Sequence, residues 1–187
     1  GLNQVVKEES RSESSLSFIP GPEGGLYWAG DLVLNHFGDG RASRRTVIDK
    51  STPALGFSDD TVALRLEVTG DGQRYKIGLS ENDWSEGGQM WQAEFDTKPG
   101  ERTVVKLPMD KATWHGTAKG QVSGKRLTMG HLPQWNRVKS IGLMFSSLDA
   151  RGNPADPAHF RGPGTFQLTV HSMEILNRES KRDSPKA

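Results

Sequence analysis

The stretch TVALRLEVTGDGQRYKIGL, residues 61–79, decides the fold that we expect for this chain. Apolar side chains alternate with polar or small ones over residues 62–68, and the same period resumes over residues 75–79. Between them, Gly-Asp-Gly at residues 70–72 can adopt positive φ, and Asp71 can bond its own backbone. The stretch therefore predicts a β-hairpin with one buried face.

Similar short apolar runs, bounded by Gly, Pro, Asp or Asn, recur along the chain and predict further strands. They cover residues 16–19, 26–34, 42–48, 90–95, 103–107, 138–145 and 164–175. No helix of convincing length is expected. Strands that each bury one face must pack as two layers, so the predicted fold is an all-β jelly-roll β-sandwich of two antiparallel sheets.

The last predicted strand contains a change of face. Apolar residues of 166–170 share one face, whereas Met173 and Ile175 fall on the other. We expect a β-bulge near His171 or Ser172, because one extra residue returns the apolar side chains to the core.

Two stretches without a clear period are predicted to be surface loops. Residues 114–129 are rich in Gly, Lys and Thr and are expected to form an extended surface excursion. Residues 149–163 are the second long loop.

A length of 187 residues suits one domain. Residues 1–14 are predicted to be an N-terminal arm or the remnant of a first strand, and residues 15–177 the sandwich. Residues 178–187 are charged and nearly free of apolar side chains, which predicts a flexible C-terminal tail.

Charge and composition narrow the classes of partner. The chain has 24 basic and 23 acidic side chains, so its net charge of +1 does not favour nucleic acid. No apolar run approaches the roughly 20 residues of a membrane helix, so direct membrane insertion is not expected. The chain has no Cys and no Asn-x-Ser/Thr site, which favours an intracellular or organellar location.

No motif indicates catalysis, a metal or a cofactor. Residues 120–126, GQVSGKR, lack the glycine spacing of a phosphate loop, and residues 38–40 open no helix of a dinucleotide site. The histidines show no metal-ligand or triad spacing, at positions His36, His115, His131, His159 and His171. The prediction is a non-enzyme without metal or cofactor.

The tryptophans are the main candidates for recognition. Trp91 alternates within a strand and is predicted to lie in the core. Trp84 and Trp114 lie in polar sequence, where they could form an exposed platform for a sugar ring or fold back as a lid on the sandwich edge. Asn35, Arg44 and Gln92 could bond the hydroxyl groups of such a sugar.

Several segments resemble the complex I intermediate-associated protein 30 family, in the same order along the chain. They are GDGQRYKIGL at residues 70–79, the Ser-Arg pair at 43–44, the aromatic strand at 90–95, VVKLP at 104–108, SIGL at 140–143 and the closing strand at 166–175. The resemblance implies a galactose-binding-like jelly roll, used by mitochondrial members as an assembly factor for respiratory complex I. Members also occur in plastids.

The first hypothesis is a non-enzymatic protein-interaction module that binds membrane-complex subunits or other assembly factors. The resemblance implies an organelle, with the mitochondrial matrix first and the chloroplast as the alternative. A carbohydrate-binding module and a stably bound accessory subunit of a larger complex remain alternatives.

Overall fold

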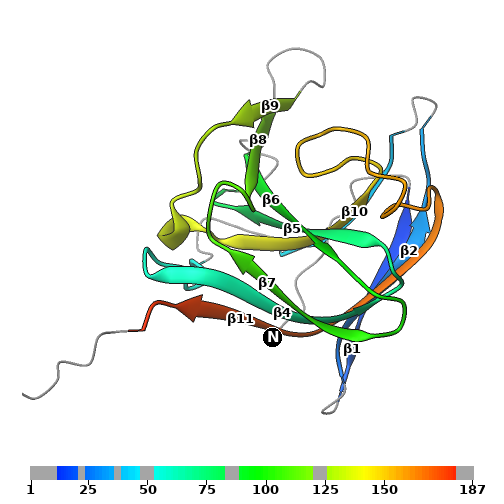
Figure 1. The fold of residues 1–187 in the computed structure, drawn as a ribbon, viewed down its shortest axis with the longest axis horizontal. Helices are drawn as coiled ribbons and strands as arrows, with labels where there is room; N and C mark the ends of the chain where they lie inside the picture. The colour runs from blue at the N-terminus through cyan, green and yellow to red at the C-terminus, as the bar shows by residue number, and fades with distance from the viewer. Residues whose placement is uncertain are drawn as a thin grey trace, which may run out of the picture.

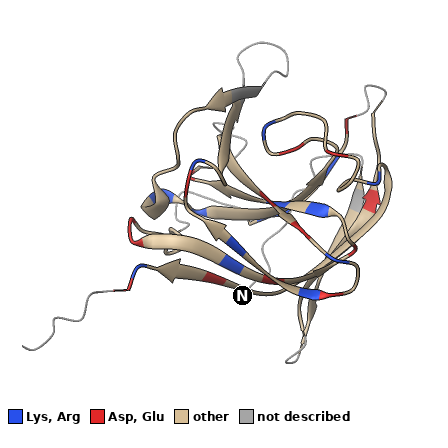
Figure 2. Cartoon of the chain, viewed as in Figure 1, with Lys and Arg blue, Asp and Glu red and all other residues tan. Residues whose placement is uncertain are grey.

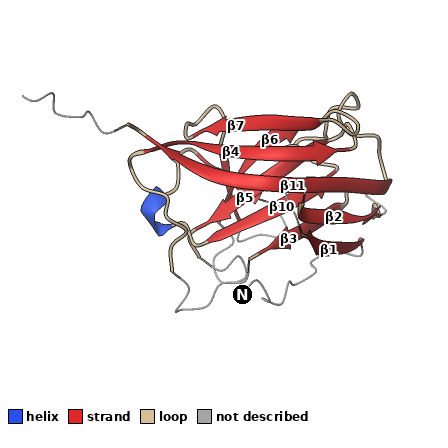
Figure 3. Ribbon diagram, turned by 90° about the horizontal axis from the view of Figure 1, so that it is seen from below, coloured by secondary structure: helices blue, strands red, loops and turns tan. Residues whose placement is uncertain are grey.

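The structure is a computed structural model that describes residues 12–20, 24–35, 39–46, 53–82, 89–119 and 126–179. Its strands form two antiparallel sheets that face each other across one core (Figures 1 and 3). One sheet contains, in spatial order, β1 (Glu13–Ile19), β2 (Gly25–Leu32), β11 (Gly164–Asn177), β4 (Thr61–Gly70) and β7 (Arg102–Pro108). The other contains β3 (Arg41–Arg45), β10 (Ser140–Ser146), β5 (Arg74–Ser80), β6 (Met90–Asp96), β8 (His115–Lys119) and β9 (Arg126–Met129). The predicted all-β sandwich is confirmed, with one 3-10 turn, η1 (Trp135–Arg137), in the part described.

The hairpin predicted over residues 61–79 is wrong. β4 pairs with β11 and β7, whereas β5 pairs with β10 and β6, so the two strands belong to different sheets. Residues 71–73 carry the chain from the end of β4 in one sheet to the start of β5 in the other. A hairpin and a crossing both turn the apolar side chains of two strands toward one core, so alternation alone does not distinguish them.

The crossing is fixed by the carboxylate of Asp71. Its Oδ1 accepts hydrogen bonds from the backbone N–H of Gln73 at 3.2 Å and from the Tyr75 hydroxyl at 2.9 Å. Its Oδ2 accepts one from the backbone N–H of Gln167 at 3.2 Å. Gly72 has φ +90°, a conformation that favours glycine. One side chain therefore joins the crossing to β5 and to β11 of the opposite sheet. Burial, followed by the Asp71 charge, raises the pKa of Tyr75 and keeps its hydroxyl protonated.

Aromatic rings from both sheets fill the middle of the core. Trp28 of β2 lies 4.8 Å from Phe166 between ring centroids, and Phe145 of β10 lies 4.9 Å from Phe166 and 5.2 Å from Tyr75. Such contacts add about 0.5–1.5 kcal/mol each beyond burial. Trp91 is also in the core, as predicted.

Trp114 is part of the core and not of an exposed platform. Its side chain is 2% exposed, its indole Nε1 donates to the Pro108 carbonyl at 2.9 Å, and its ring meets Trp135 edge to face. Of the two predictions for this residue, the exposed platform is wrong, and the residue folds back to cover the end of the sandwich.

At the start of β4 the alternation slips. Thr61 and Ala63 are buried and Val62 is 41% exposed, although Val62 was predicted to share the buried face. The pairing with β11 is irregular between Leu176 and Asn177, opposite this point. A register irregularity reverses the faces of the residues beyond it, which explains the exposed Val62.

The bulge predicted in the last strand is confirmed. The pairing of β11 with β4 shifts between Val170 and Ser172. The expected return of the apolar side chains to the core holds in part, because Ile175 packs against the core whereas Met173 is 41% exposed. The prediction for residues 114–129 is wrong in part, because β8 and β9 pair there and extend the six-stranded sheet. Their polar and glycine-rich composition hides the period, since an edge ribbon buries few side chains. Residues 120–125 lie outside the described part.

Removing the Asp71 carboxylate should destabilise the sandwich. We expect Asp71→Ala to lower the free energy of unfolding by about 3 kcal/mol, because the buried Tyr75 hydroxyl and the buried Gln73 side chain lose a charged acceptor together. Urea denaturation measures the loss. The matched control is Asp59→Ala at an exposed turn acid, and an equal loss in both variants would contradict the assigned role.

Candidate functional site

The six-stranded sheet has one face turned away from the core, and on this face polar side chains from several strands lie next to one another. We call it the outer face. On β6, Trp91, Ala93 and Phe95 point into the core, so Gln92 and Glu94 stand on the outer face. The cross-strand register places the outer residues of β3, β10, β5 and β8 beside them.

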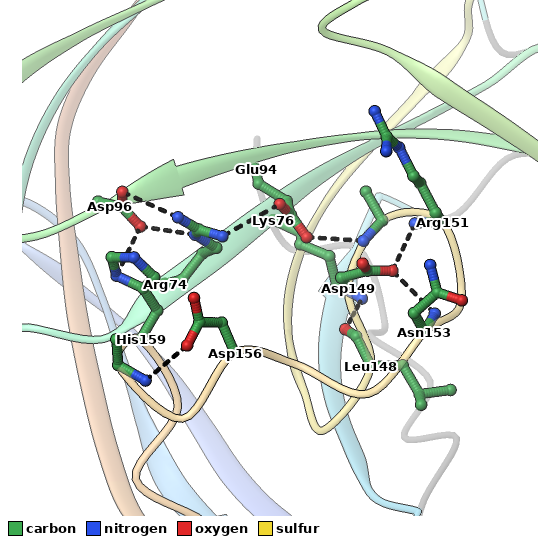
Figure 4. Close-up of polar contacts among 12 residues, drawn as sticks. Arg74, Lys76, Glu94, Asp96, Leu148, Asp149, Arg151, Asn153, Asp156 and His159 are labelled. Atoms are coloured by element: carbon green, nitrogen blue, oxygen red, sulfur yellow. Dashed lines mark hydrogen bonds and ion pairs between the residues drawn. The ribbon is translucent and has the colours of Figure 1, made fainter.

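One half of the outer face is an ion-pair cluster centred on Arg74 (Figure 4). Arg74 Nε and Nη2 donate to the two carboxylate oxygens of Asp96 at 2.7 and 3.2 Å, and Nη1 lies 3.6 Å from Glu94 Oε2. His159 Nδ1 lies 3.4 Å from the same Asp96 carboxylate. The cluster thus pairs cations and anions within itself.

This cluster also holds the loop of residues 147–163 against the sheet (Figure 4). The buried Lys76 ammonium donates to the Leu148 carbonyl at 2.8 Å, and the Ala150 amide donates to Glu94 Oε1 at 2.7 Å. At the other end of the loop, the Arg74 amide donates to the His159 carbonyl at 2.9 Å. The charged side chains are therefore engaged in fastening a loop.

The ion pair of Arg74 and Asp96 does not suit acid catalysis. Hydrogen bonding from Arg74 is the first cause that lowers the pKa of Asp96, and bonding to Asp96 in turn raises the pKa of Arg74. A carboxyl group held ionised by a guanidinium is a poor proton donor near neutral pH. Figure 2 shows basic residues on β5 and acidic residues on β6, so these two neighbouring strands present charges of both signs.

The other half of the outer face has a low floor made by glycines. Gly78 of β5 lies directly opposite Gly142 of β10, and the nearly buried Met90 and Met144 lie over Gly78. A shallow pocket at this place is also bordered by polar and basic side chains of Arg41, Ser43, Arg45, Ser80 and Ser140. Gln92, opposite Gly78 on the next strand, is 6% exposed, and its buried Oε1 has no hydrogen-bond partner.

The family model of complex I intermediate-associated protein 30 (CIA30) matches residues 10–170, which is most of the chain. The chain belongs to the CIA30 family. The comparison with curated proteins gave no match.

Solved structures place this CIA30 domain among known sandwiches. The family 11 carbohydrate-binding module of the cellulosomal cellulase Lic26A-Cel5E of Clostridium thermocellum is similar over 97% of this chain and 92% of that chain, with 11% identity and a TM-score of 0.60. An exo-beta-agarase matches 94% of this chain and 23% of its own, with 8% identity and a TM-score of 0.48. At such identities the likeness to the module shows a shared fold.

Of the residues predicted to bind, the four that the structure describes do not converge in this CIA30 domain. The Asn35 side chain accepts a bond from the Asp39 amide at 3.0 Å and so closes a turn. The Arg44 guanidinium donates to the Ser14 carbonyl of β1 and so links the two sheets. Gln92 alone stands on the outer face beside the glycine floor, while Trp114 is buried and Trp84 lies outside the described residues. Their roles in binding stay predictions.

The residues that sequence reasoning missed are the paired glycines and the methionines over them. The sequence does contain a sign of this floor, because Ile-Gly-Leu occurs twice, at residues 77–79 and 141–143. In each strand the glycine stands between two apolar residues, at a position that alternation assigns to the face away from the core. Recognising that two such strands pair in register requires the sheet order.

Within the described ranges, no group of three or more His, Cys, Asp or Glu side chains could hold a metal ion. No helix in the same ranges is long and apolar enough to cross a membrane.

The lowered pKa of Asp96 predicts a pH effect on stability. A carboxyl group whose pKa is lower in the folded state stabilises the fold above its unfolded pKa of about 3.9, and this contribution disappears as pH falls through the folded value. Asp96 is half exposed, so we expect Asp96→Asn to cost less than about 1 kcal/mol at neutral pH.

The same variant should also lose less stability than the unchanged protein when the pH falls below about 4. Urea denaturation over a pH series measures both effects, with the exposed Asp59→Asn as the control. Parallel stability curves for Asp96→Asn and the unchanged protein would contradict the ion-pair assignment.

Proposed function

We propose that this CIA30 domain is a non-enzymatic protein-interaction module that binds subunits or assembly factors of a membrane protein complex, respiratory complex I in the first place. Membership of the family supports the class of partner. The observation that carries the proposal is the glycine and methionine half of the outer face, where Gln92 holds a buried acceptor without a donor.

The side chains of the outer face favour a protein partner. Met90 and Met144 are flexible and polarizable, and such side chains adapt to peptide surfaces of different shape. Sugar recognition commonly uses an aromatic ring as a stacking platform. The outer-face positions of the described strands carry Ser, Thr, Met, Gly, Gln, His and charged residues in place of Phe, Tyr or Trp.

The proposed role requires no catalysis. Glu94 and Asp96, the acids that stand together on the outer face, are both bonded to Arg74 or to the loop it holds. Ion pairs of this kind hold the backbone of the loop in place on the sheet. A binding module needs such a fixed surface and no reactive group. We place the protein in the mitochondrial matrix, with the chloroplast as the alternative, because the family description names complex I.

Carbohydrate binding is a second candidate, favoured by one observation. The amide of Gln92 stands on the outer face of a sheet in a fold shared with a carbohydrate-binding module. Amide groups bond sugar hydroxyls well. A glycan array probed with the full chain separates the two candidates.

Affinity purification tests the proposal. The tagged full chain is recovered from organelles of the native source after mild cross-linking, and the recovered proteins are identified. The expected result is a set of subunits or assembly factors of one membrane complex, with no glycan bound on the array. Selective glycan binding without such proteins would favour the second candidate and contradict the first.

A pair of serine variants tests the surface. Ser43 borders the pocket of the outer face, whereas Ser17 is exposed on β1 of the other sheet. We expect Ser43→Arg to reduce the recovered partner by about tenfold, because a bulky charge obstructs close contact. Ser17→Arg should recover the partner as the unchanged protein does. Loss of the partner with Ser17→Arg and full recovery with Ser43→Arg would contradict contact through the outer face and indicate contact through the five-stranded sheet.

A further inference from the structure

A straight row of five residues crosses the outer face at right angles to the strands. The register pairs Arg45 with Gly142, Gly142 with Gly78, Gly78 with Gln92, and Gln92 with His115. Neighbouring strands lie about 4.8 Å apart, so the row is a transverse trough with side chains at both ends and two glycines within it.

Two methionines close the trough over Gly78. A Cβ atom placed on Gly78 would lie 2.8 Å from Met144 Cε and 2.9 Å from Met90 Sδ. Their tips thus occupy the space that a side chain at this position would take. Methionine has three rotatable side-chain bonds and repacks at low cost, so the two tips form a plug that another side chain can displace.

Gln92 supplies a polar group beside this plug. Its side chain stands on the outer face next to Gly78, is 6% exposed, and leaves Oε1 buried without a hydrogen bond. An unsatisfied buried acceptor costs about 1–3 kcal/mol. A ligand that donates a hydrogen bond to Oε1 removes this cost, and the complex is stabilised relative to the unbound protein.

We propose that Gly78, Met90, Met144 and Gln92 form a latent slot for one side chain of an extended peptide, apolar in its stem and carrying an uncharged hydrogen-bond donor at its tip. This rests on the proposed function and names the chemistry of its partner. The apolar stem replaces the methionine tips on the glycine floor, and the donor bonds Gln92 Oε1. The tip is uncharged because two cations repel another cation there: Arg45 stands at the end of the same row, and Lys76 stands in the adjoining row.

The probe is a random peptide library displayed on phage and selected against the full chain. Enriched peptides are expected to share an apolar residue beside Asn, Gln, Ser, Thr, Tyr or Trp. Added to protein labelled with ¹³C at the methionine methyl groups, they should shift the Met90 and Met144 resonances before those of the other methionines. Failure to enrich such peptides, or shifts produced by cello- or agaro-oligosaccharides instead, would overturn the slot.

Glycine variants test the slot with little change to the fold. The atoms nearest to a Cβ on Gly78 belong to the flexible side chains of Met144 and Met90, which must shift, so Gly78→Ala fills the slot, whereas Gly130→Ala makes the same change in open space. We expect Gly78→Ala to weaken the selected peptides by about tenfold or more and Gly130→Ala to leave them unchanged.

Gln92→Met provides a second variant of similar volume. It removes the acceptor, so it should also weaken the peptides by about tenfold, the value of one hydrogen bond. Peptides that bind both slot variants as well as the unchanged protein would refute the slot. Recovery of native complex subunits by Gly78→Ala at the unchanged level would refute the slot alone, whereas failure of the unchanged protein to recover them would count against the proposed function.

Discussion

The fold depends on one covalent constraint, the crossing of the chain from β4 to β5 between the two sheets. Three residues make this crossing, and the Asp71 carboxylate bonds it to the hydroxyl of Tyr75 in one sheet and to the amide of Gln167 in the other. Because Tyr75 begins the core face of β5, the crossing also sets which residues of β5 point outward. The position of Gly78 on the outer face follows from it.

Much of the fold could be predicted from the sequence, because alternation reports burial directly. The bulge in β11 followed from a change of face between Val170 and Met173, and the core position of Trp91 followed from its strand period. Alternation carries no information on which strands pair. The hairpin and the crossing share one pattern of alternation. The prediction for residues 61–79 was the hairpin, in which neighbouring strands pair, whereas in the structure the two strands lie in different sheets.

The site was less predictable for a related reason. Residue type suggested Asn35, Arg44 and Trp114, yet each is engaged in holding the fold, through a turn, a link between sheets and the core. Gln92 was named on residue type and does stand beside the glycine floor. The floor itself arises only when Gly78 and Gly142 pair, a long-range relation that local sequence does not contain.

The central claim is that β4 and β5 belong to different sheets and that this places Gly78 opposite Gly142. Backbone nuclear Overhauser effects in the labelled protein test it most directly, since protons of paired strands lie within a few ångströms. The account predicts cross-strand contacts between Gly78 and Gly142, and between Val68 and Val170. A ladder of contacts between the residues of β4 and those of β5 would contradict it.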